Sequence, residues 1–77
     1  MLQKYSDLFR RVFNIEGEQA LESLEYQGIK EWDSVGHMAL IASIENEFDI
    51  QLDVDDVIDF SSFSEGRKIL AKYGVML

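Results

Sequence analysis

The residue pair in this sequence with the clearest chemical potential is a serine that directly follows an aspartate. Asp33 precedes Ser34, and apolar residues recur every three or four positions from Val35 onward. This spacing predicts a helix with Asp33 as its N-cap and Ser34 at its first position. Unpaired backbone N–H groups at a helix N-terminus carry partial positive charge and suit a phosphate ester. Ser34 is therefore either a site for such an ester or half of an ordinary capping pair.

Other kinds of site chemistry find little support. The chain has no cysteine and one histidine, His37. It offers no thiolate or histidine-based zinc site, and thiol chemistry would need an added cofactor. His37 lies three residues after Ser34, but no orienting acid or oxyanion motif accompanies the two. We therefore expect no enzyme activity and an exposed His37, whose functional use would be contact with a cofactor arm.

Length and charge narrow the function classes. The 77 residues predict a single domain, 1–77, too small to enclose both a core and a deep catalytic pocket. The 7 basic and 15 acidic residues give a net charge of −8. Such a surface repels nucleic acid and favours basic protein partners. With no signal-peptide core at residues 1–7 and no membrane-length apolar run, we expect a cytoplasmic monomer without membrane insertion.

Apolar periodicity predicts helices throughout. One apolar stripe marks a helix over residues 2–14, and a second helix runs from Ser34 to about Phe48. A brief helix follows near residues 54–60, and a last one begins with a Ser62–Glu65 capping box and ends at Gly74. Residues 15–33 read as a long ordered loop with a short turn at 19–24. The predicted class is all-α, a small bundle of three longer helices and one short helix.

The neighbourhood of Ser34 resembles a known family. Asp33-Ser34-Val35 is similar to the Asp-Ser-Leu signature of acyl carrier proteins, and residues 45–49 (Glu-Asn-Glu-Phe-Asp) look like that family's acidic helix end. The order and spacing of the expected elements also match, over nearly the whole chain. The resemblance implies an acyl-carrier-protein-like fold. It also implies a 4'-phosphopantetheine arm on Ser34, transferred from coenzyme A by a phosphopantetheinyl transferase.

In that family the terminal thiol of the arm carries an acyl group as a thioester. The resemblance therefore implies partners with basic docking surfaces: acyl-activating, acyltransferase or synthase enzymes. The docking candidates on this chain are two apolar and five acidic residues: Val35, Met38, Glu45, Glu47, Asp49, Asp55 and Asp56. The acids are either docking groups or a merely solvated face. Helical spacing places Val35 and Met38, with Ile41, mostly in the core.

Trp32 and the acidic residues after Asp53 could each have a functional or a structural role. Trp32 either packs at the junction of loop and helix or belongs to a partner footprint. The residues from Asp53 onward do not form a calcium-binding loop. Val57 stands at a position that needs an oxygen ligand, Ile58 at the position that needs glycine, and Ser64 at the position of the final acidic ligand. We therefore expect no metal site.

Two residues depart from the common fatty-acid carriers. Gly36 and Ala39 stand where those carriers have acids soon after the serine. We therefore expect a specialised acyl, lipid or secondary-metabolite pathway. The nearest alternative function is that of an aminoacyl carrier. The Gly-Gly-x-Ser-like signature of peptidyl carriers is missing from this sequence. A carrier of the D-alanyl type remains an open alternative, because its serine motif can look like this one. The alternative from another class is a cofactor-free acidic helical interaction module in which Ser34 only caps a helix.

The clustered acids predict sensitivity to divalent cations. Mutual repulsion among like charges destabilises the compact state, and divalent cations reduce it. Millimolar Mg²⁺ or Ca²⁺ should raise the melting temperature measured by circular dichroism. An increase no larger than that produced by matched monovalent salt would contradict this prediction.

Overall fold

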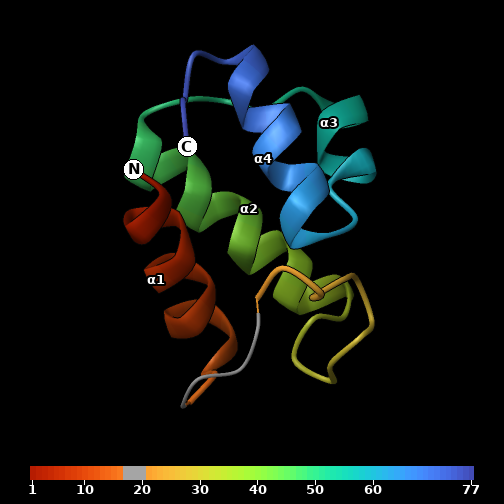
Figure 1. Ribbon diagram of the computed structural model, residues 1–77. Coiled ribbons are helices and arrows are strands. Elements are labelled where there is room, and N and C mark those ends of the chain that lie inside the picture. The colour runs from red at the N-terminus through yellow and green to blue at the C-terminus, as the bar shows by residue number, and fades with distance from the viewer. Residues whose placement is uncertain (17–20) are drawn as a thin grey trace.

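Residues 1–16 and 21–77 are described by a computed structural model, shown in Figure 1. In this part of the chain four α-helices follow one another: α1 (Leu2–Phe13), α2 (Ser34–Phe48), α3 (Val54–Asp59) and α4 (Phe63–Lys72). The only β-type pairing there is an isolated bridge between Glu25 and Ser62. The predicted all-α class, with three longer helices and one short one, is confirmed. None of these helices combines the length and apolarity needed to cross a bilayer.

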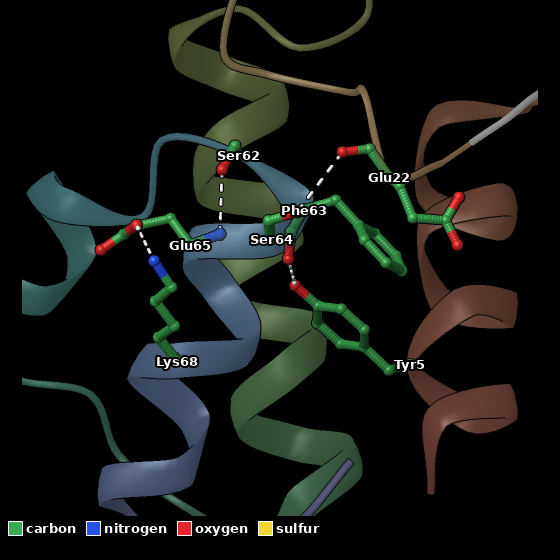
Figure 2. A network of polar contacts seen from close by, with 7 residues as sticks. All are labelled: Tyr5, Glu22, Ser62, Phe63, Ser64, Glu65 and Lys68. Carbon is green, nitrogen blue, oxygen red and sulfur yellow. Dashed lines mark hydrogen bonds and ion pairs between the residues drawn. The ribbon is translucent and has the colours of Figure 1, made fainter.

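Local capping groups set the helix ends where the sequence placed them. Asp33 Oδ1 accepts a hydrogen bond of 2.8 Å from Gly36 N–H at the start of α2. Ser62 Oγ accepts one of 2.9 Å from Glu65 N–H at the start of α4 (Figure 2). Gly74, just after α4, has a φ of +82°, which glycine adopts without steric cost. The Asp33 cap and the Gly74 turn were predicted. Of the reciprocal capping box predicted at the start of α4, the structure shows the bond to Ser62 Oγ, while the Glu65 carboxylate lies 3.8 Å from Lys68 Nζ.

The loop before α2 is anchored to the segment before α4. A turn joins Leu24 N–H to the Leu21 carbonyl, which confirms part of the turn expected at 19–24; residues 19 and 20 lie outside the described part. The Leu24 carbonyl accepts from Phe63 N–H at 3.0 Å, and Tyr26 N–H donates to the Ser61 carbonyl at 2.8 Å. In Figure 1 this loop lies at the same end of the molecule as the start of α2.

An aromatic cluster forms the centre of the core. Phe9 of α1 is fully buried, and its ring centroid lies between 4.9 and 6.4 Å from five other aromatic rings. Those rings come from α1, the loop, the segment before α4 and α4 itself: Tyr5, Phe13, Trp32, Phe60 and Phe63. Each favourable aromatic pair adds about 0.5–1.5 kcal/mol beyond the burial of its area.

Tyr5 connects α1 to α4 through the core. Its hydroxyl donates a hydrogen bond of 2.8 Å to the Phe63 carbonyl, and Figure 2 shows the side chain reaching the first turn of α4. The residue is fully buried, and this burial raises the pKa of the phenol. The bond satisfies a buried hydroxyl that would otherwise be costly.

The predicted core positions at the start of α2 were wrong. Val35 is 80% exposed and Met38 is 56% exposed, whereas Ile41 is buried as expected. The core face of α2 is formed by Leu40, Ile41 and Ile44. Because apolar residues surround much of this helix, periodicity identified the helix but not the side that the rest of the chain covers.

Gly66 offers a test of how closely α4 packs. A Cβ at this position would lie 2.3 Å from both the Tyr5 hydroxyl and the Phe60 ring. An exposed Gly→Ala change in a helix stabilises by up to about 1 kcal/mol. Gly66→Ala should instead destabilise by about 1–3 kcal/mol, because the core must shift. Urea unfolding measures this; Lys68→Ala on the exposed face of α4 is the control, and a more stable Gly66→Ala would contradict the packing.

Candidate functional site

The Ser34 hydroxyl is exposed at the first position of α2. Asp33 caps the helix by accepting from Gly36 N–H with its side chain and from His37 N–H with its carbonyl. The cap is therefore made by Asp33, and the Ser34 side chain takes no part in it. Ser34 Oγ instead lies 3.2 Å from the Tyr26 hydroxyl, an oxygen–oxygen distance at which either group can donate. This geometry leaves the serine hydroxyl available for chemistry.

Tyr26 reaches Ser34 from a loop with defined main-chain contacts. Its own N–H is bound to the Ser61 carbonyl, and the next residue, Gln27, has a φ of +66°. Gln27 N–H donates to the Trp32 carbonyl at 2.9 Å, which closes the loop on itself just before α2. The approach of Tyr26 to Ser34 therefore follows from how the loop is folded.

His37 is half-buried, so the expectation of an exposed histidine was wrong. Its Nδ1 accepts from Trp32 Nε1–H at 3.0 Å, and its Nε2 lies 2.7 Å from the Val57 carbonyl. Because the indole can only donate, Nδ1 must be the acceptor, and Nε2–H donates to Val57. Both nitrogens are thus occupied, which leaves no lone pair to deprotonate Ser34. The ring also packs edge-on against Tyr26, with centroids 5.5 Å apart.

Trp32 packs at the junction of the loop and α2, as one of the two interpretations predicted. It is fully buried, and its ring stacks on Phe13 at a centroid distance of 5.2 Å. A buried indole of this kind offers no surface to a partner. The partner-footprint interpretation of Trp32 is therefore ruled out in this conformation.

A hollow of about 370 Å³ opens beside Ser34. It lies between α2 and the segment that runs from α3 toward α4, and its lining is mainly apolar. The lining residues are Tyr26, Ser34, His37, Met38, Val57, Ile58, Phe60 and Ser61. Its volume falls in the range of small-molecule sites. Ser34 therefore lies beside a concave apolar surface.

Two acids at the end of α2 have partners within the chain. Glu45 accepts a hydrogen bond of 2.9 Å from Leu52 N–H, which fixes the connector after the helix. Glu47 pairs with Lys4 at 3.6 Å and with Arg11 at 3.5 Å, both on α1. The sequence placed these acids at the unfavourable end of the helix dipole. Intramolecular contacts account for their presence, while their docking role stays a prediction.

Of the other three acidic docking candidates, two are exposed and one is buried. Asp49 and Asp55 are exposed. Asp56 is buried: its carboxylate receives hydrogen bonds from Lys72 Nζ at 2.6 Å and from the Tyr73 hydroxyl at 2.5 Å. The Lys72 bond first, and the Tyr73 bond second, hold the pKa of the Asp56 carboxyl below its ordinary value. Asp56 is thus a link between α3 and α4 and is not presented for docking, which corrects its assignment as a docking candidate.

The structure gives a steric reason for the glycine at position 36 that the sequence did not show. A Cβ at this position would lie 1.9 Å from the carbonyl oxygen of Glu31. The loop backbone therefore approaches α2 too closely for any side chain at Gly36. Ala39, by contrast, is exposed and free of this constraint.

Within residues 1–16 and 21–77, no group of three or more histidine, aspartate or glutamate side chains is arranged to hold a metal ion. Comparison of the chain with protein-family models, with curated proteins and with solved structures found no match. The geometry at Ser34 is therefore the structural feature that bears on function.

Tyr26 and Ser61 are the site residues that sequence reasoning missed. Tyr26 stood out in the sequence only as one of the sparse apolar residues of the loop. It lies eight residues before Ser34, a separation that no helical or strand periodicity relates to contact. The one available signal was a large aromatic side chain in a loop with few apolar residues.

The Asp56 contacts predict a pH-dependent loss of stability. A carboxyl whose pKa is lowered by folding stabilises the folded state fully above its unfolded pKa, about 3.9, and stops doing so as pH falls through the folded value. Asp56→Asn should therefore lower the melting temperature at pH 7, and the difference from wild type should shrink below about pH 4. Thermal melts across pH measure this, with exposed Asp55→Asn as the control. A difference independent of pH would contradict the assignment.

Proposed function

We propose that this protein is an acyl carrier protein whose 4'-phosphopantetheine arm is attached to Ser34. The observation that carries the proposal is the division of roles at the start of α2. Asp33 makes the cap, and Ser34 keeps an exposed hydroxyl beside an apolar hollow. A serine present only as a cap would use its oxygen to accept a backbone N–H bond. The resemblance around Asp33-Ser34-Val35 supports the same function.

The residues at the site fit attachment of the arm. Ser34 is exposed, so a transferase active site can reach Oγ. In the attachment step Ser34 Oγ bonds to the phosphorus of coenzyme A that bears pantetheine, and the bond to adenosine 3',5'-bisphosphate breaks. The hydroxyl proton passes to a base on the transferase, because both His37 nitrogens are already bound. The arm supplies the thiol that this cysteine-free chain lacks.

The chain's own contribution is then presentation. A group tethered at Ser34 has a high effective concentration at any enzyme on which the protein docks. Val35 and Met38 are exposed on α2 next to Ser34, and Ile58 of α3 is 70% exposed. Together with Asp49 and Asp55 they form the proposed docking surface for basic partner enzymes.

The pathway proposal now depends on Ala39. Gly36 is required by the nearby Glu31 carbonyl, so its lack of charge carries no information about partners. Exposed Ala39 still makes the front of α2 less acidic than in common fatty-acid carriers. We keep the proposal of a specialised acyl pathway in the cytoplasm, served by a monomeric carrier of the family's helical fold. Loading and elongation by housekeeping synthases as efficient as for their own carrier would refute it.

Covalent loading tests the function directly. Incubation with coenzyme A, Mg²⁺ and a broad-specificity phosphopantetheinyl transferase should add one phosphopantetheine to the wild-type protein, as measured by intact mass. Ser34→Ala should gain none, because it lacks the only proposed nucleophile. Ser61→Ala is the matched control, since Ser61 lines the same hollow and should not affect loading.

Circular dichroism establishes that both serine variants are folded. Failure of the wild-type protein to gain mass with several active transferases would favour a cofactor-free interaction module. Loading of Ser34→Ala would place the arm on another residue.

A further inference from the structure

The phenol of Tyr26 lies 3.2 Å from the hydroxyl of Ser34, a hydrogen bond between two side chains at the start of α2. A serine side chain has three staggered rotamers, and an exposed one exchanges among them freely. A hydrogen-bond partner on a fixed support selects one of these rotamers. The Tyr26 hydroxyl can therefore select a Ser34 rotamer only if Tyr26 is itself held in place.

Tyr26 is held from two directions. Its backbone N–H is bound to the Ser61 carbonyl at 2.8 Å, so the residue is attached to the segment before α4. Its ring packs edge-on against His37, which is fixed by hydrogen bonds to Trp32 and Val57. The side chain also remains 36% exposed, so a transferase can reach the hydroxyl pair from solvent. Support combined with access is what the positioning of a nucleophile requires.

We infer that Tyr26 is the positioning residue of the Ser34 site. Before modification its phenol fixes the direction of the Ser34 hydroxyl, and after modification it donates a hydrogen bond to the ester oxygens at Ser34. The change of role follows from the chemistry of the pair. Either oxygen can donate while Ser34 has its proton, but an esterified Ser34 oxygen has none, so only Tyr26 can then donate. This inference rests on the proposed carrier function.

The position of Tyr26 also accounts for why a tyrosine stands in this loop. Phenylalanine would fill the same space against His37 but could neither orient Ser34 nor bind an anionic ester. Hydrogen bonds to charged acceptors are stronger than those between neutral groups, so the contact should be stronger in the modified protein. Tyr26→Phe removes the hydroxyl alone and keeps both the ring contact and the Ser61 backbone bond.

The test compares wild type, Tyr26→Phe and Tyr5→Phe as substrates of one phosphopantetheinyl transferase. Tyr5→Phe is the matched control, because it also removes one phenolic hydroxyl, from a buried bond to the Phe63 carbonyl that does not involve Ser34. Tyr26→Phe should lower kcat roughly three- to ten-fold, the effect of one lost hydrogen bond, with little change in KM. Tyr5→Phe should lower the melting temperature and leave kcat unchanged.

Phosphorus NMR of the loaded proteins gives a readout independent of transferase activity. The resonance of the Ser34-linked phosphodiester should shift in Tyr26→Phe relative to wild type and stay in place in Tyr5→Phe. If Tyr5→Phe does not fold, Lys68→Ala replaces it, since Lys68 is exposed on α4, pairs with Glu65 and does not line the hollow beside Ser34.

The outcomes separate this inference from the function on which it rests. If the wild-type protein is loaded, and Tyr26→Phe has the same kcat and the same phosphorus resonance as wild type, the role of Tyr26 is overturned and the carrier proposal stands. A change in KM alone would make Tyr26 a docking contact and also overturn it. Absence of loading in wild type would overturn both proposals together.

Discussion

Packing around Phe9 is the interaction on which the other parts of this structure depend. Its ring contacts aromatic rings from α1, the loop, the segment before α4 and α4 itself. A chain of 77 residues without disulfides has few other means of fixing a long loop. Trp32 belongs to this cluster and comes two residues before Ser34, so the same packing that stabilises the fold also places the start of α2.

A polar connection extends from this cluster to the serine. Trp32 donates to His37, His37 donates to Val57, and the His37 ring supports Tyr26. The sole histidine thus joins the loop, α2 and α3, and its two bonds require the neutral ring with the proton on Nε2. Its structural use explains why a histidine three residues from Ser34 contributes no base. The surface around Ser34 stays open while its support is buried, as the proposed attachment of an arm requires.

The acidic residues of the chain fall into two groups that composition alone does not distinguish. Three acids bind groups within the fold. Glu45 accepts from a backbone amide, Glu47 pairs with a lysine and an arginine, and Asp56 binds a lysine and a tyrosine hydroxyl. Asp49 and Asp55 are exposed and remain available to a partner. Ion pairs near the surface, such as those of Glu47, contribute about 0–1 kcal/mol. Asp56, by contrast, is buried and bound by Lys72 and Tyr73.

The sequence by itself determined the helices, their order, and the caps at Asp33, Ser62 and Gly74. These depend on hydrogen bonds and apolar spacing within about four residues, which local sequence encodes. Only the tertiary structure decided which face of α2 is buried, that Gly36 must lack a side chain, and that Tyr26 meets Ser34. Those facts depend on where a non-periodic loop lies against the helices. Its position is set by long-range aromatic packing, for which sequence spacing gives no rule.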